Sequence, residues 1–531
     1  RHGARLSGSN LRGADFTGST GVSMHAVTDL RGADFTDSTD ARAFYAGRGE
    51  PAKDLTGAVF RGVRFHPVAF AGFEGDRPAD LSQALMEGAI LICTRLLQQP
   101  DMRAHWVAWI RALEPRFPWD AWLESAELGS VQEVNVHELS AMQPLARTVL
   151  STPVATWKAY FTYKYLVNYA AVLPRALDDE NFDFYSRTLN GQQQQRDRWR
   201  RAVTATNGAL GKAIGQIYVQ RHFSADAKAQ MLALVENMRR AYGERINALT
   251  WMSPETKVAA REKLQTFLPK IGYPDNWRDY SALEVRAGDA FGNRKRSGAY
   301  QWRYDVARLG RPTDKSEWLY MEPQTVNASY NSVMNVITFP AAILQPPFFD
   351  PHADDAVNYG AIGGVIGHEM GHGFDDQGAK SDAHGVLRDW WTAQDVQRFS
   401  ALTASLATQY SGFEALPGLH LNGQNTLGEN IGDNGGLQVA YYAYHLALNG
   451  AEAPVLDGFS GDQRFFMSWA QAWRTKMRDA FLRTIVTSDE HSPAYFRCNG
   501  TVRNMDAWYA AFNVQPSNAL YLPDSERVEI W

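Results

Sequence analysis

Cysteine is nearly absent from this sequence. Its 531 residues include only Cys93 and Cys498. A framework of several disulfide bonds and a zinc site built from cysteine side chains both need more thiols than this. The sequence therefore excludes both kinds of site. A single bridge is the most that the chain could form, and no pattern in the sequence favours it.

Long apolar runs and a large charge of one sign are missing as well. A helix that crosses a membrane needs about 20 consecutive apolar residues. The best stretch, residues 84–97, is shorter and is interrupted by Glu87 and Arg95. The formal net charge of −5 at pH 7 offers no electrostatic reason to expect a nucleic acid. We therefore expect no transmembrane segment and no nucleic-acid partner.

The length and the first residue bear on organisation. At 531 residues the chain is too long for a single compact core, so two or three domains are expected. It begins at Arg1, with neither an initiator methionine nor a signal-like segment. We interpret it as a fragment or a processed product, whose compartment is not indicated by its residues alone.

The first part of the chain contains a repeat. In "NLRGADFTGS", "DLRGADFTDS" and "DLTGAVFRGVRF", leucine or phenylalanine recurs at every fifth position, often with a small residue two positions earlier. This pattern resembles the pentapeptide-repeat family, whose chains coil into a right-handed β-solenoid. Because irregular stretches break the rows, residues 1–78 are interpreted either as a short solenoid-like segment or as an irregular one.

Helical patterns dominate the rest of the chain. "SADAKAQMLALVENMRRAYGERINAL" repeats apolar residues three and four positions apart, which predicts an amphipathic helix. "SPETKVAAREKLQTF" predicts a helix that is capped by Ser253 and has Pro254 at its first position. From about Asn327, "NASYNSVMNVITFP" is rich in β-branched and aromatic residues and ends at Pro340, which predicts a strand. The fold is therefore expected to be mainly α, with some β structure.

The motif "GHEMGH" carries the first chemical signal. Residues four apart lie on one face of a helix, so His368 and His372 would present their imidazoles side by side. Glu369 would lie close enough to reach a water bound to a metal between them. Two imidazoles leave a catalytic zinc one protein ligand short, because such a site needs three and keeps one position open.

A third ligand is offered by "TLGENIGDNGG". Glu429 and Asp433 are again four residues apart and share a helical face. Glu429 can bind the metal, while Asp433 can accept the second N–H group of a metal-binding imidazole and so set its tautomer. Asp375 and Asp376 are further candidates for that supporting role.

Glycines surround the histidine motif at Gly363, Gly364, Gly367 and Gly371. In a helix interior each of them costs about 1 kcal/mol relative to alanine. We therefore expect that tertiary packing against a close backbone neighbour sustains this helix.

Several long motifs together resemble a known family, the neprilysin-like zinc metallopeptidases of the thermolysin-like group. They are "VNASYN", "FPAAILQPPFF", "NYGAIGGVIGHEMGHGFDDQG", "LNGQNTLGENIGDNGGL" and "HSPAYFRCNG", and softer similarity extends back to about Ser82. The resemblance implies a mainly α (α+β) fold, with a largely helical cap lobe over residues 79–320 and a thermolysin-like zinc peptidase lobe over residues 321–531. It also implies an extracytoplasmic location, either periplasmic or secreted.

The resemblance implies a zinc-dependent endopeptidase that hydrolyses oligopeptides with a zinc-activated water. Glu369 matches the general base, and His491 matches a residue that hydrogen-bonds the developing oxyanion. With Asp433 behind the metal, these residues form the expected catalytic set. One Zn²⁺ per chain is implied, with the ligands His368, His372 and Glu429.

The resemblance also implies contacts with a peptide substrate. Asn327 and Ala328 match an edge-strand pair that grips the substrate backbone, and Arg497 matches a contact to a substrate carbonyl. Val365 and Trp473 match positions that line the pocket for the residue after the scissile bond. A large apolar pocket there favours cleavage on the N-terminal side of hydrophobic residues.

The chain departs from the family at its start, where the repeat-like stretch stands in place of an N-terminal segment that contributes to both lobes. Two readings therefore remain. The chain is either an active zinc endopeptidase or an inactive, truncated peptidase that acts as a binding or scaffold protein. Neither the physiological peptide nor the oligomeric state is indicated by the sequence.

Overall fold

The structure is a computed structural model that describes part of the chain in detail. The residues described are 5–7, 23–26, 39–41, 64–65, 111–112, 114–131 and 139–531. The chain divides into two compact units, Arg1–Lys164 and Tyr165–Trp531. Each unit is described by itself.

The first unit contains short strands and helices. Among its described residues, β1 (Arg5–Ser7) pairs in parallel with β2 (Ser23–Ala26), and β3 (Thr39–Ala41) pairs in parallel with β4 (Arg64–Phe65). The described helices include α3 (Trp119–Ser125), α4 (Leu139–Ser151) and most of α5 (Val154–Tyr169). Most of the repeat segment lies outside the described residues, so the choice between a solenoid-like and an irregular segment stays a prediction.

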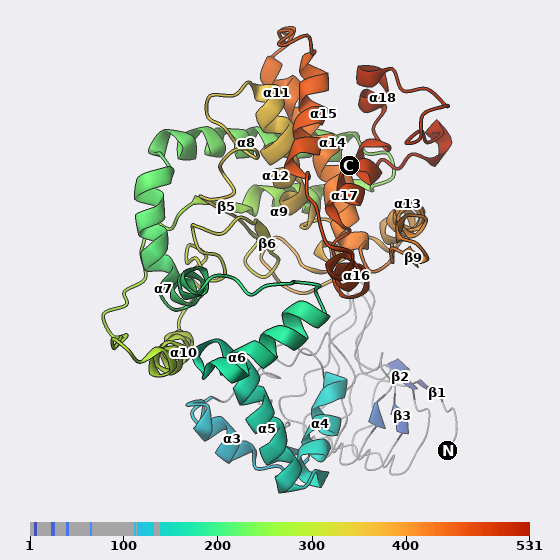
Figure 1. Ribbon diagram of the computed structural model, residues 1–531. Coiled ribbons are helices and arrows are strands. Elements are labelled where there is room, and N and C mark those ends of the chain that lie inside the picture. The colour runs from blue at the N-terminus through green and yellow to red at the C-terminus, as the bar shows by residue number, and fades with distance from the viewer. Residues whose placement is uncertain are drawn as a thin grey trace. The chain divides into compact units, whose positions relative to one another are not determined.

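The second unit is mostly helical (Figure 1), which confirms the prediction of a mainly α fold. Its α-helices are α6 (Arg175–Phe182), α7 (Arg198–His222), α8 (Ala225–Ala248), α9 (Pro254–Thr266), α10 (Ala290–Val306), α11 (Asp355–Asn358), α12 (Gly364–Gly371), α13 (Ala393–Ser411), α14 (Leu427–Leu448), α15 (Gly461–Ala472), α16 (Asp479–Ser488), α17 (Ala494–Val502) and α18 (Asp506–Phe512). Short 3₁₀ or π segments are η2 (Ala170–Val172), η3 (Asp183–Thr188), η4 (Tyr359–Gly363), η5 (Gly378–Lys380) and η6 (Asp524–Glu526). In the part of the chain that the structure describes, no helix is both long and apolar enough to cross a membrane.

Helix starts follow the local signals in the sequence. The α9 helix begins at Pro254, and the Ser253 hydroxyl accepts a hydrogen bond from the Thr256 backbone N–H at 3.4 Å. The α8 helix covers the predicted amphipathic segment, and it buries apolar side chains three and four residues apart. These side chains are Met231, Leu234, Val235, Met238, Tyr242 and Ile246.

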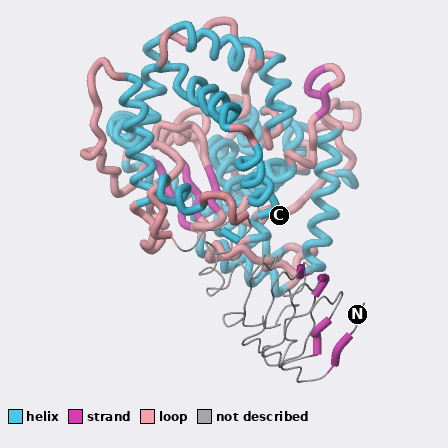
Figure 2. The backbone as a smooth tube through the Cα atoms, turned by 90° about the horizontal axis from the view of Figure 1, so that it is seen from below, coloured by secondary structure: helices cyan, strands magenta, loops and turns pink. Residues whose placement is uncertain are grey.

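The second unit contains a small sheet, drawn in magenta in Figure 2. Its order is β5 (Leu268–Gly272), β7 (Val336–Pro340) and β6 (Ser329–Asn331). The central strand β7 runs parallel to β5 and antiparallel to β6, so β6 lies at an edge. The predicted strand after Asn327 is therefore two strands joined by a turn. A separate hairpin joins β8 (Glu414–Leu416) to β9 (Leu419–His420).

Helices α12 and α14 lie against each other at the centre of this unit (Figure 1), and their contact is made by glycines. A Cβ atom on Gly367 would lie 2.3 Å from the Gly436 carbonyl oxygen, and one on Gly436 would lie 2.3 Å from the His368 nitrogen. Only glycine allows two helix backbones to approach this closely. The expectation that close packing sustains the glycine-rich helix is confirmed, and the same contact places α14 beside both histidines.

Candidate metal centre

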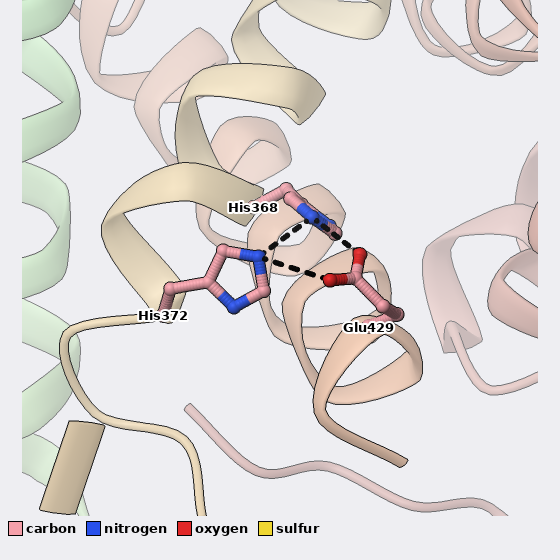
Figure 3. A group of neighbouring side chains, drawn as sticks. All are labelled: His368, His372 and Glu429. Carbon is pink, nitrogen blue, oxygen red and sulfur yellow. Dashed lines mark hydrogen bonds and ion pairs between the residues drawn. The ribbon is translucent and has the colours of Figure 1, made fainter. Parts of the chain in front are cut away.

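Three of the predicted site residues converge on one point (Figure 3). His368 projects from α12, His372 caps the C-terminal end of that helix, and Glu429 comes from the first turn of α14. The two Nε2 atoms are 3.0 Å apart. The Glu429 oxygens lie 3.1 Å from His368 Nε2 and 3.6 Å from His372 Nε2. The three potential ligand atoms lie within 4.8 Å of one another, which is close enough to hold a single ion.

A carboxylate lies behind each of the two imidazoles. The Nδ1 atom of His368 lies 2.8 Å from Asp433 Oδ1, and the Nδ1 atom of His372 lies 2.7 Å from Asp375 Oδ2. Both carboxylates are buried. If each Nδ1 carries its proton toward a carboxylate, each Nε2 presents a lone pair to the centre, as a metal requires.

Of the two aspartates that follow the histidine motif, only Asp375 contacts the imidazole of a motif histidine. Asp375 contacts His372, and its other oxygen accepts the backbone N–H groups of Gln377 and Gly378 at 2.9 and 2.7 Å. Asp376 instead accepts a hydrogen bond from the Gln377 side chain at 2.7 Å. Asp375 is therefore the better candidate to support His372.

The donor set fits zinc. Two imidazoles and one carboxylate are the three protein ligands of a hydrolytic zinc site, and a fourth position stays open for water or substrate. Burial opposes the charge on Glu429, but the neighbouring His368 and His491 hold its pKa well below its usual range. Glu429 is therefore a carboxylate, and it offers a negative charge to a cation.

Glu369 lies on α12 beside His368 and is buried. Burial raises the pKa of Glu369 above its ordinary value. A carboxylate whose pKa is shifted toward neutrality is suited to accept a proton and return it at a later step.

His491 lies at the edge of the centre, ahead of α17. Its Nε2 atom is 3.1 Å from Glu429 Oε2, and its Nδ1 atom is 2.8 Å from Asp489 Oδ1. Asp489 also accepts the His491 backbone N–H at 2.8 Å, so it orients both the ring and the backbone. Sequence reasoning missed Asp489. The only signal for it is its position two residues before His491.

Arg497 on α17 contacts Asp433, the carboxylate behind His368. It donates two hydrogen bonds to Asp433, at 2.7 and 2.8 Å, and its guanidinium lies 4.1 Å from the centre of the Trp473 ring. Arg497 therefore holds the same carboxylate that holds His368, a contact that the sequence did not indicate. Its predicted contact with a substrate carbonyl stays a prediction.

The other predicted substrate contacts are spread over three elements. Asn327 is exposed and Ala328 is buried, immediately before the edge strand β6. Val365 is on α12, one turn before Glu369, and Trp473 follows the last residue of α15. The structure thus places the first pair directly before the edge strand β6, and Trp473 against Arg497.

Known proteins resemble most of the chain. Two models described as Peptidase family M13 match residues 102–274 and 327–528, and a model of pentapeptide repeats matches residues 2–21. Neprilysin of Homo sapiens is 35% identical over 384 residues, which are 70% of this chain and 50% of neprilysin. Endothelin-converting enzyme 1 of Bos taurus is 30% identical over 512 residues, which are 92% of this chain and 67% of that protein.

Solved structures agree with these matches. The crystal structure of the zinc metalloprotease ZMP1 of Mycobacterium tuberculosis, bound to an inhibitor, is 48% identical and has a TM-score of 0.76. The similarity covers 80% of this chain and 65% of that one. The chain spans about half the length of the neprilysin relatives that it matches.

Proposed function

Because the chain belongs to peptidase family M13, we propose that it is a zinc-dependent endopeptidase that acts on oligopeptides. One observation carries this proposal: two imidazoles and a carboxylate converge from α12 and α14, each imidazole with a buried carboxylate at its other nitrogen. One Zn²⁺ per chain would be held by His368, His372 and Glu429. Zinc there would polarise the peptide carbonyl and lower the pKa of a water ligand.

The proposed proton transfers belong to Glu369. Its buried carboxylate accepts a proton from the attacking water and passes it to the leaving amine. His491 donates a hydrogen bond from Nε2 to the oxyanion that develops on the substrate carbonyl, and Asp489 fixes the ring for this role. Asp433 and Asp375 keep the two metal-binding imidazoles in the tautomer that the centre needs.

The proposed substrate binds along β6, the edge strand of the described sheet. Asn327 and Ala328 would hydrogen-bond the peptide backbone as an added strand. Arg497 would contact a substrate carbonyl, while Val365 and Trp473 would line an apolar pocket. We therefore propose cleavage on the N-terminal side of hydrophobic residues.

A second function is favoured by the pentapeptide-repeat match at residues 2–21. Because repeats of this kind form extended surfaces, we propose as the alternative a binding or scaffold protein with an inactive peptidase part.

We further propose that the chain divides into residues 1–78, 79–320 and 321–531, and that it has an extracytoplasmic location.

Metal analysis combined with a cleavage assay separates the two functions. The purified chain should contain one zinc per molecule and should cleave a quenched fluorescent peptide before a phenylalanine or leucine. His372→Phe should abolish zinc retention, whereas His384→Phe, at an exposed histidine, should retain it. A zinc-loaded wild-type chain that cleaves no peptide in a mixed library would refute the peptidase and support the binding protein.

A further inference from the structure

We propose that Lys212 on α7 is a positioning residue for peptide binding, which holds the chain segment that leads into the edge strand β6. This inference rests on the proposed role of Asn327 and Ala328 at that edge. The connecting segment, residues 317–324, ends shortly before Asn327. Its position therefore sets where the edge strand starts.

Lys212 grips the connecting segment with its ammonium group. Its Nζ atom donates a hydrogen bond to the Met321 carbonyl at 2.5 Å and forms an ion pair with Glu322 at 3.1 Å. The Lys212 side chain is only 4% exposed. A buried cation is costly unless it is paired and hydrogen-bonded. The buried ammonium of Lys212 therefore depends on the oxygen atoms that the connecting segment supplies.

The surface of α7 is shaped to receive the same segment. A Cβ atom on Gly211 would lie 2.5 Å from the Glu322 side chain, and one on Gly215 would lie 2.6 Å from Pro323. The two glycines are one helical turn apart, and side chains of the segment pack directly on the helix backbone at both positions. The Gln324 side chain also donates to the Gly211 carbonyl at 2.9 Å.

The other end of the connecting segment is fastened to the sheet. Lys270 on β5 donates from Nζ to the Glu317 carbonyl at 2.7 Å. Lys270 is in register with Thr338 on β7, and Thr338 is in register with Ser329 on β6. A small cavity lies between segment and sheet, and it is lined by Trp318, Leu319, Met321, Ser329, Met334 and Val336. The connecting segment therefore packs over one face of the sheet that contains β6.

The charges around Lys212 are balanced by the segment itself. Glu322 is the direct ion-pair partner of Lys212. The negative charge of Glu317 also favours the charged ammonium, whereas the positive charge of Arg278 disfavours it. The Lys212 backbone N–H donates to the Tyr280 hydroxyl at 3.2 Å. Burial lowers the pKa of Lys212, and the attraction of Glu322 counters that shift. Removal of the ammonium would leave the Met321 carbonyl and the Glu322 carboxylate without their cation.

The predicted effect is on peptide affinity and not on chemistry. We expect loss of this charge-assisted hydrogen bond to weaken the affinity for peptide roughly tenfold. In Lys212→Met, and in Lys212→Met combined with Glu322→Gln, we expect KM for a peptide to rise about tenfold with kcat and zinc content little changed. Lys212→Arg, which keeps the charge, should restore most of the affinity.

The experiment measures KM and kcat, and also the Kd of the same peptide for zinc-loaded protein in a Glu369→Gln background. Lys228→Met is the matched control, because Lys228 pairs with the exposed Asp275 away from the connecting segment. Wild-type zinc protein that binds but does not cleave peptide refutes the proposed peptidase, while Kd still tests Lys212. This inference would be overturned by an unchanged Kd in the folded double variant or by a loss confined to kcat. It would also be overturned if no Lys212 variant folds, or if the Glu369→Gln protein binds no peptide.

Discussion

The Nδ1 atom of His368 lies 2.8 Å from Oδ1 of the buried Asp433, while Nε2 of the same ring faces Glu429 at 3.1 Å. Arg497 donates two hydrogen bonds to Asp433 and so prevents the carboxylate from turning away. The orientation of the His368 ring therefore depends on contacts among α12, α14 and α17.

Replacement of Glu369 separates the proposed base from the metal ligands. Glu369→Gln should retain one zinc per chain, because Glu369 is not among the three proposed ligands, whose side chains converge on one point. Its peptidase rate should fall by about 10²- to 10⁴-fold, the usual contribution of a general base. Metal analysis and steady-state kinetics measure both effects, with Glu236→Gln on the exposed face of α8 as the control. Normal turnover by the metal-loaded variant would remove Glu369 from the mechanism.

His491 should act in the transition state. Its Nε2 atom faces the centre and its Nδ1 atom is held by Asp489, so we expect a preorganised hydrogen-bond donor. His491→Ala should lower kcat by about 100-fold or more, with little change in KM, zinc content or melting temperature. His384→Ala, at an exposed histidine, should change none of these. A variant that melts early but turns over at the normal rate would show that His491 is structural.

The glycine contact between α12 and α14 should be intolerant of a methyl group. Gly436→Ala would place a Cβ atom 2.3 Å from the His368 backbone nitrogen. The helices would have to separate, at a cost of about 3 kcal/mol of unfolding free energy, and zinc affinity should fall with them. Chemical denaturation and metal titration measure the two effects.

Gly298 provides the matched control for that substitution. It lies within α10, is exposed and has open space where a Cβ atom would be. Gly298→Ala should therefore stabilise the protein by up to about 1 kcal/mol through helix propensity. Equal effects of the two substitutions would contradict the close approach of α12 and α14.

Lys263 on α9 should make stability depend on pH. Its fully buried ammonium donates to the Gly378 and Ser381 carbonyls at 2.8 and 2.5 Å. Burial lowers the pKa of Lys263 to about 7, whereas an unfolded lysine has a pKa of about 10.4. Between these values the unfolded chain binds more protons, so this residue's contribution to stability rises with pH.

We therefore expect wild type to gain roughly 2 kcal/mol relative to Lys263→Met between pH 7 and pH 9. Equilibrium unfolding at several pH values measures the difference, and it cancels the other groups that titrate in both proteins. Lys476→Met, at an exposed lysine, should show no such trend against wild type. A constant difference between wild type and Lys263→Met across this range would contradict the prediction.

Local features were readable from the sequence because they depend on neighbours along the chain. The four-residue spacing of His368 and His372 defines a helical face whatever surrounds it. Ser253 and Pro254 start α9 through a hydroxyl and a ring that act within one turn. The β structure predicted over residues 327–340 is confirmed, but the sequence does not indicate the turn that divides it into β6 and β7.

Tertiary structure alone decided which distant groups meet. Glu429 reaches the histidines because glycines let α14 pack directly on α12, and no spacing along the chain specifies that approach. The contacts of Arg497 with Asp433, and of Lys212 with Met321, likewise join residues far apart in sequence. Helix periodicity follows from backbone geometry that repeats every few residues. Contact between helices instead depends on how whole side-chain surfaces fit together, which is determined only when the chain is packed.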